Sequence, residues 1–205
     1  MRLSLVRTGL KPAVFVLGLA PAALLARGAV SGTLGANPLE AVTHGTGDWA
    51  LRFLLITLAV TPLRALTGWN PLALFRRMLG LFAFFYATLH LLTYLWFDRM
   101  FSVSAMLSDV PRRPFIAVGL AAFGSLVPLA ATSTAGMIRR LGGRRWRALH
   151  RLAYAAAVLG VVHYWWLVKA DTTSPRRYAV LLAGLLAARV IVALRRGGPF
   201  VRQRP

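Results

Sequence analysis

Three histidines lie in or beside long apolar stretches of this sequence: His90, His150 and His163. A neutral imidazole keeps a lone pair on one ring nitrogen, so it binds transition metals and relays protons. Ionisable side chains within apolar segments are costly and usually mark function. The segment RWRALHRLAYAAAVLGVVHYWW carries two of the three, thirteen residues apart. These histidines are therefore the first candidates for residues that bind a metal or transfer protons.

The elements that must position them are apolar helices. The chain has 205 residues, of which 58% are hydrophobic, and its mean hydropathy is +0.62. Six apolar runs each suit a helix across a layer of about 30 Å, which takes roughly 20 residues. They cover residues 12–31, 48–66, 78–97, 114–132, 149–168 and 178–194. We predict an all-α fold: a single integral membrane domain over residues 1–205, with six transmembrane helices and no soluble catalytic domain.

The basic residues predict the orientation of this bundle. Sixteen of the 25 Lys and Arg residues fall in four segments that share one side: Arg2, Arg7 and Lys11; Arg64, Arg76 and Arg77; Arg139, Arg140, Arg144, Arg145, Arg147 and Arg151; Arg195, Arg196, Arg202 and Arg204. By the positive-inside rule this side is the cytoplasm, so both termini are expected there. The five acidic residues fall in the other three connections: Glu40, Asp48, Asp98, Asp109 and Asp171.

Several other classes of protein are disfavoured. The net charge of +20 is explained by the basic residues on the cytoplasmic side of the bundle. Nucleic-acid binding is disfavoured, because the sequence has no soluble basic face with interleaved aromatic residues. The absence of cysteine excludes iron–sulfur clusters, thioether haem attachment and a thiolate nucleophile. The basic start and the small residues of ARGA also fit a secretory signal. We favour a first transmembrane helix that is not cleaved off, because the apolar run is longer than the core of a usual signal peptide. Its removal would also leave a bundle with an uneven number of five spans.

The depths of the histidines suggest a pair. His90 lies thirteen residues beyond Arg77, and His163 lies sixteen residues beyond Arg147. At 1.5 Å per residue both are roughly 20 Å or slightly more above the cytoplasmic side, in the outer half of the bilayer. His150 lies near the cytoplasmic boundary. Two imidazoles facing each other from different helices are what a six-coordinate haem iron needs.

Small residues beside both histidines leave room for a flat macrocycle. They are Gly80, Ala83 and Ala87 on one helix, and Ala153, Ala156, Ala157 and Gly160 on the other. Small residues also serve simply to let helices approach closely, and that alternative stays open. A second haem at His150 meets a geometric difficulty, because thirteen residues on an ideal helix place His150 and His163 about 140° apart.

Three longer runs carry a family resemblance: THGTGDWALRFLLITLAVTPL, RRMLGLFAFFYATLHLLTY and ATSTAGMIRRLGGRRWRALHRLAYAAAVLGVVHYWWLVKAD. Together they resemble MsrQ, the family of haem-binding membrane subunits of the periplasmic protein-methionine-sulfoxide reductase system. That family belongs to the ferric-reductase-like transmembrane group. The resemblance covers residues 30–194, nearly the whole chain.

The resemblance implies an electron-transfer subunit of the bacterial inner membrane with no complete active site of its own. It implies one or two b-type haems and a flavin mononucleotide (FMN) as cofactors. Electrons would come from the quinone pool or a cytoplasmic flavin reductase. They would pass to a periplasmic molybdopterin-containing methionine-sulfoxide reductase, the catalytic partner in a heterodimer that repairs oxidised proteins.

The resemblance also implies site residues. In the wider group, paired histidines on the third and fifth spans hold two haems, and His90, His150 and His163 match three of those four positions. The fourth position is Arg76, and a guanidinium is not a normal haem ligand. We therefore expect His90 and His163 to hold the outer haem iron, while the partner of His150 and the number of haems stay open.

Other charged residues are candidates for contacts with haem propionates or a flavin phosphate, because a guanidinium fork matches such anions. These are Arg52, Arg76, Arg77, Arg144 and Arg145. The competing interpretation is that they set topology and contact anionic membrane lipid, and that Arg52 snorkels to the interface. His44 opens an outer connection and is a candidate residue of the outer site. Asp98 and Asp109 predict an acidic docking surface for a basic partner.

Two other functions are weighed. A polytopic transporter or proton-relay protein would also use membrane histidines, but no carboxylate lies within any predicted span. A self-contained reductase that takes hydride from a nicotinamide would need a dinucleotide-binding fingerprint, and the sequence has none.

Overall fold

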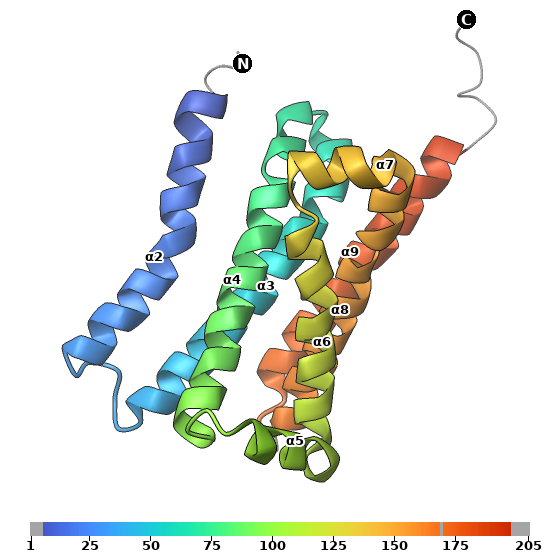
Figure 1. Ribbon diagram of the computed structural model, residues 1–205. Helices are drawn as coiled ribbons and strands as arrows, with labels where there is room; N and C mark the ends of the chain where they lie inside the picture. The colour runs from blue at the N-terminus through green and yellow to red at the C-terminus, as the bar shows by residue number, and fades with distance from the viewer. Residues whose placement is uncertain (1–5, 169, 198–205) are drawn as a thin grey trace, which may run out of the picture.

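The computed structural model describes residues 6–168 and 170–197, and all regular structure in this part of the chain is helical (Figure 1). The long helices are α2 (Lys11–Val30), α3 (Pro38–Thr67), α4 (Arg76–Thr93), α5 (Val103–Arg112), α6 (Pro114–Ala131), α7 (Ala135–Leu149), α8 (Leu152–Leu167) and α9 (Thr173–Gly197). Short helical turns are η1 (Val6–Leu10), η2 (Asn70–Leu74) and η3 (Tyr94–Asp98). The all-α prediction is confirmed for the described residues.

Five helical stretches in the described part of the chain are long and apolar enough to cross a membrane. They are Thr8–Val30, Pro38–Thr67, Asn70–Phe97, Pro114–Ala131 and Thr173–Arg195. The run expected over residues 149–168 contains α8, which is apolar but has only 16 residues. A helix of that length rises about 24 Å, somewhat less than a hydrocarbon layer of about 30 Å. The six-span count therefore stays a prediction.

Helix α3 begins ten residues earlier than the predicted span of 48–66. Asn37 caps its first turn, because the Asn37 side chain accepts a hydrogen bond from the Glu40 amide at 3.2 Å and donates one to the Glu40 carboxylate at 2.9 Å. The helix ends at Gly68, whose φ of 67° closes the C-terminus. As a result His44 lies on α3, and its predicted place in a connection is wrong.

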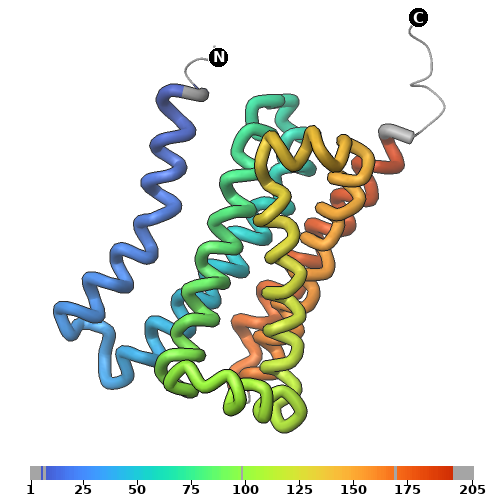
Figure 2. The backbone as a smooth tube through the Cα atoms, in the orientation of Figure 1, coloured from blue at the N-terminus to red at the C-terminus, as the bar shows by residue number. Residues whose placement is uncertain are grey.

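The helices form a bundle with one short helix across each end (Figure 2). Helix α3 packs most extensively on α4 and α6 on α8, and contacts of α4 with α6 and of α9 with α3 and α8 join these pairs. Helix α7 lies across one end, beside the start of α2 and the end of α9, and α5 lies across the other end (Figure 1). We call these the α7 end and the α5 end. Both α5 and α7 fall in segments that the sequence analysis treated as connections.

A row of stacked aromatic rings forms the core between α3 and α4. The ring of Phe53 stacks on Tyr86 at 5.4 Å and on Phe82 at 5.2 Å, measured between ring centres. The hydroxyl of the fully buried Tyr86 donates to the Gly18 carbonyl at 2.8 Å and accepts from the Ala22 amide at 3.0 Å. This single side chain therefore links the peripheral helix α2 to the centre of the bundle.

Candidate functional site

The structure brings His90 and His163 together at the α5 end of the bundle. His90 lies three residues before the end of α4, and His163 lies four residues before the end of α8. Their ring centres are 6.0 Å apart, and the ring planes cross at 76°. These are the two imidazoles whose matched depths predicted that they would face each other.

A backbone carbonyl of a neighbouring helix holds each ring. The Nδ1 atom of His90 lies 2.9 Å from the Thr43 carbonyl on α3, and the Nδ1 atom of His163 lies 2.6 Å from the Phe115 carbonyl on α6. A carbonyl oxygen can only accept a hydrogen bond, so Nδ1 must carry the proton in both rings. The lone pair is then on Nε2, which is the protonation state of a metal-binding histidine with a second partner.

The pair of imidazoles fits an iron porphyrin better than a bare metal ion. Within the described residues, no group of three or more His, Asp or Glu side chains is placed to bind a metal. A porphyrin brings four nitrogen ligands and needs only two from the protein. With about 2 Å for each metal–imidazole bond and about 1 Å from ring centre to nitrogen, two such rings have centres roughly 6 Å apart. The observed separation of 6.0 Å agrees with this value.

His150 lies at the opposite, α7 end, in the turn between α7 and α8. Its Nε2 atom is 3.2 Å from the Thr132 hydroxyl, and its ring stacks on Trp146 at 3.8 Å. The Thr132 hydroxyl donates to the Pro128 carbonyl at 2.6 Å, so at His150 it accepts. Nε2 therefore carries the proton, and the lone pair of the neutral ring is on Nδ1. The Arg76 guanidinium is close enough to interact electrostatically with this ring.

The turn at His150 also removes the basis of one sequence argument. The angle of about 140° between His150 and His163 assumes one continuous ideal helix. In the structure α7 ends at Leu149 and α8 begins at Leu152, so His150 is not part of α8. The direction of the His150 side chain depends on the conformation of this turn. The angle calculated for an ideal helix therefore does not apply to His150.

Arg52 lies on α3 and already has partners. Its Nε donates to the Tyr178 hydroxyl at 2.9 Å, and its Nη2 lies 3.3 Å from the Asp48 carboxylate. Asp48 is the first residue of the predicted span 48–66, and the earlier start of α3 adds Glu40 to a helix that is long and apolar enough to cross a membrane. The statement that no carboxylate lies within a span is therefore wrong for this helix. A propionate contact of Arg52 stays a prediction.

The other predicted arginines lie at the α7 end. Arg76 and Arg77 open α4, Arg144 and Arg145 lie on α7, and all four are exposed. Arg76 is close enough to Arg64 and Arg189 for these guanidinium groups to interact electrostatically. The structure therefore gathers positive charge near His150, away from the His90–His163 pair.

His44 is exposed on α3, and its Nδ1 atom is 4.0 Å from the Glu40 carboxylate. The preceding residue, Thr43, supplies the carbonyl that holds His90. His44 thus lies beside the pair in sequence, while its own side chain points to the surface.

Sequence reasoning missed three participants: the Thr43 and Phe115 carbonyls and the Arg189 side chain. Backbone carbonyls carry no sequence signal, so only the packing of helices could reveal them. Arg189 had a signal, because it interrupts the apolar run LLAARVIVAL. Its guanidinium donates to the Leu58 carbonyl at 2.8 Å and also to Thr61 and Tyr154.

Asp109, expected at a docking surface, is only 7% exposed. Its carboxylate accepts hydrogen bonds from the Tyr94 hydroxyl at 2.7 Å and from the Arg99 guanidinium, and the Arg113 Nε lies 3.7 Å away. The expectation of an accessible charge at Asp109 is therefore wrong, because Tyr94, Arg99 and Arg113 surround its carboxylate and bury it. The side chain of Asp98 lies outside the described residues.

The Asp109 cluster predicts a pH-dependent stability. The hydrogen bond from Tyr94, helped by Arg99, holds the pKa of Asp109 below its usual 3.8. This stabilisation is complete above the usual pKa and is lost as the pH falls through the lower folded pKa. We expect Asp109→Asn to lower the melting temperature of detergent-solubilised protein at pH 7, and the difference from wild type to shrink as the pH falls below the usual pKa of 3.8. Glu40→Gln, at an exposed position, is the control. A difference between Asp109→Asn and wild type that stays constant until the protein is fully acid-unfolded would contradict the prediction.

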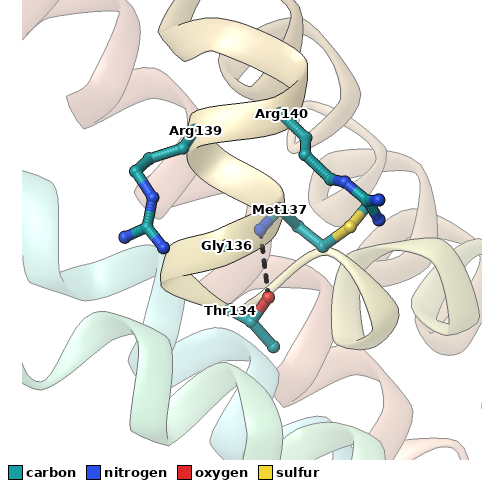
Figure 3. A pocket seen from close by; sticks show the side chains of 5 residues that line it. All are labelled: Thr134, Gly136, Met137, Arg139 and Arg140. Atoms are coloured by element: carbon teal, nitrogen blue, oxygen red, sulfur yellow. Dashed lines mark hydrogen bonds between the residues drawn. The ribbon is translucent and has the colours of Figure 1, made fainter.

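A shallow hollow of the surface lies at the start of α7, lined by Thr134, Gly136, Met137, Arg139 and Arg140 (Figure 3). The Thr134 hydroxyl accepts a hydrogen bond from the Met137 amide at 3.1 Å and caps the helix. The guanidinium groups of Arg139 and Arg140 point to opposite sides of α7 (Figure 3). They do not converge on one ligand, and the hollow lies at the other end of the bundle from the histidine pair.

Comparison with known proteins agrees with this arrangement. Residues 46–161, more than half of the chain, match the family described as "Ferric reductase like transmembrane component". This region includes both His90 and the turn at His150, while His163 lies two residues beyond its end.

Three relatives share one name, "Protein-methionine-sulfoxide reductase heme-binding subunit MsrQ". The protein of Herminiimonas arsenicoxydans is 54% identical over 188 residues, which cover 91% of this chain and 86% of that protein. The protein of Azospira oryzae is 53% identical over 194 residues, with coverage of 94% and 83%. The protein of Rhodospirillum rubrum is 54% identical over 184 residues, with coverage of 90% and 88%. The chain is therefore a membrane protein that belongs to the MsrQ family, within the ferric-reductase-like transmembrane group.

Proposed function

We propose that this chain is a haem b-binding electron-transfer subunit of a bacterial inner membrane. The observation that carries the proposal is the His90–His163 pair, in which both Nδ1 atoms donate to carbonyls and both Nε2 lone pairs are left for iron. The name of the relatives, a haem-binding subunit, supports it. The basic residues support a six-span bundle with both termini and the α7 end in the cytoplasm, and the α5 end toward the periplasm.

His90 and His163 would hold the haem iron through their Nε2 atoms, and the iron would supply one-electron transfer. The chain contributes the geometry: Thr43 and Phe115 fix the tautomer of the two rings and make them stronger donors. The rings lie within about one turn of the ends of α4 and α8. Only a short protein layer therefore separates the pair from a partner docked at the α5 end.

At the α7 end we propose that electrons enter, from the quinone pool or from a flavin reductase. Arg76, Arg77, Arg144 and Arg145 supply positive charge there for haem propionates or for the phosphate of FMN. His150, with its lone pair on Nδ1, is the candidate ligand of a second haem. Anionic lipid is the other partner that these exposed arginines suit.

The electron acceptor that we propose is a periplasmic molybdopterin-containing methionine-sulfoxide reductase, joined to this chain in a heterodimer. The relatives are named as subunits of a protein-methionine-sulfoxide reductase, which supports this choice. The chain itself then needs no complete active site, since the sulfoxide is reduced on the partner.

A reconstituted system tests the proposed function. Haem-loaded chain in vesicles, with a quinol inside and the catalytic partner outside, is expected to reduce methionine sulfoxide in proportion to the amount of chain. The chain is expected to show a b-type reduced-minus-oxidised spectrum. Colourless protein that moves protons or a solute would contradict the proposal and favour the alternative of a transporter or proton relay.

A further inference from the structure

Each imidazole of the pair lies against a glycine of the neighbouring helix. A Cβ atom built on Gly47 of α3 would lie 3.1 Å from the Cε1 and Nδ1 atoms of His90. A Cβ atom on Gly119 of α6 would lie 2.8 Å from the same two atoms of His163. Both distances are shorter than the optimal separation of about 3.5–4.0 Å between carbon atoms. A methyl group on Gly119 would have to displace the ring of His163, and a methyl group on Gly47 would push the ring of His90 by a few tenths of an ångström.

Both glycines follow, by four residues, the carbonyl that holds the same ring. Thr43 precedes Gly47, and Phe115 precedes Gly119. In an α-helix the Cα–Cβ bond tilts toward the N-terminus, so a side chain covers the turn before its own Cα. A glycine therefore leaves the carbonyl four residues earlier open from the side. The second lone pair of that oxygen can then accept the Nδ1–H of a histidine.

The same arrangement occurs twice, on helices far apart in sequence. Helix α3 provides it for His90 on α4, and α6 provides it for His163 on α8, and these are the two most extensively packed helix pairs. Glycine alone does not imply such a contact: Gly124, also on α6, would present a Cβ to open space.

We propose that Gly47 and Gly119 are positioning residues for the two iron-binding imidazoles. Each glycine leaves space for one imidazole to approach and hydrogen-bond a helix carbonyl. This hydrogen bond sets the tautomer of the ring and the plane in which its Nε2 atom is presented to the iron. This inference rests on the proposed function, since it takes the haem between His90 and His163 as given. It goes further than the proposed function, because it states that two glycines, which have no side chain, control the ring orientation and the basicity of both histidine ligands.

Replacing these glycines by alanine is expected to disturb the haem and not the helices, because alanine is the better helix former. A displaced ring loses or lengthens its hydrogen bond to the carbonyl. Loss of such a partner typically costs roughly 10–100-fold in metal affinity. We expect this loss in Gly119→Ala and a smaller one in Gly47→Ala, following the two Cβ distances. A less basic imidazole favours ferrous iron, so the midpoint potential is expected to rise.

The experiment compares wild type, Gly47→Ala, Gly119→Ala and the matched control Gly124→Ala in membranes. Haem per chain, the midpoint potential and the low-spin ferric electron paramagnetic resonance signal are measured. That signal depends on the angle between the ring planes, which is 76° here. We expect a changed signal and a raised potential in both pair variants, with Gly124→Ala like wild type.

Wild-type haem content, potential and signal in both pair variants would overturn the inference and leave the proposed function intact. If Gly119→Ala does not accumulate, the milder Gly47→Ala decides the question by the same measurements. Wild-type protein without haem would instead reject the proposed function, and the inference with it.

Discussion

The His163→Ala variant is expected to lose the haem at the α5 end, and so is His90→Ala. Each substitution removes one of the two Nε2 lone pairs of the His90–His163 pair, whose ring centres are 6.0 Å apart. Partners that merely support a metal-binding histidine are worth roughly 10–100-fold in affinity, so loss of the ligand itself should cost more than that. Haem content is expected to fall by about one equivalent per chain, because a bis-histidine iron needs both rings.

Reduced-minus-oxidised spectra and haem stoichiometry of purified variants measure this loss. His44→Ala is the matched control, since His44 is exposed on α3 and its side chain lies beside Glu40. His150→Ala, at the other end of the bundle, is expected to keep the His90–His163 haem and to lose only a second one. A double His90→Ala, His163→Ala variant with its full haem content would refute the assignment.

Arg189→Leu is expected to destabilise the bundle by about 2–3 kcal/mol, because it removes a charged hydrogen-bond donor from a carbonyl that has no other helical partner. Pro62 lies inside α3 and has no amide hydrogen, so it cannot bond the carbonyl of Leu58 four residues earlier. The Arg189 Nε on α9 supplies this bond at 2.8 Å, and its Nη2 binds Thr61 at 2.9 Å. Within a hydrocarbon layer no water is present to replace it.

A double-mutant cycle separates this role from a general need for charge. Pro62→Ala supplies the amide donor that the Leu58 carbonyl lacks, so it is expected to recover about 1 kcal/mol when combined with Arg189→Leu. The free energy of unfolding in mixed detergent micelles is the measurement. Arg177→Leu, an exposed position on the same helix, is the control. Strict additivity of the two substitutions would show that Arg189 does not compensate for Pro62.

Several features were accessible from the sequence because they are local. The apolar runs predicted the positions of α2, α4, α6 and α9 to within a few residues. The start of α3 was missed because the cap at Asn37 and a polar first turn precede the apolar run, so hydropathy alone does not detect them. The turn at His150 was missed for a similar reason, since the amphipathic α7 and the apolar α8 adjoin in one continuous helix-forming stretch.

The histidine pair was predictable only in part. Counting residues from the charged ends gives the height of His90 and His163, because the rise per residue of a helix is constant. That count does not give the rotation of each helix about its axis, and it does not give which other helix packs against it. The structure decides them, and it places His90 against Thr43 and Gly47 of one helix and His163 against another.

By itself, then, the sequence determined the membrane class, the clustering of basic residues and the matched heights of the two imidazoles on their helices, since hydropathy, charge and helical rise belong to each segment separately. Only the tertiary structure decided which carbonyl each imidazole binds, which ring nitrogen keeps the lone pair, and that Arg189 bonds the carbonyl that Pro62 leaves without a helical donor. The physical reason is that these bonds join residues 47 to 131 positions apart, and their geometry depends on how whole helices rotate and cross when they pack.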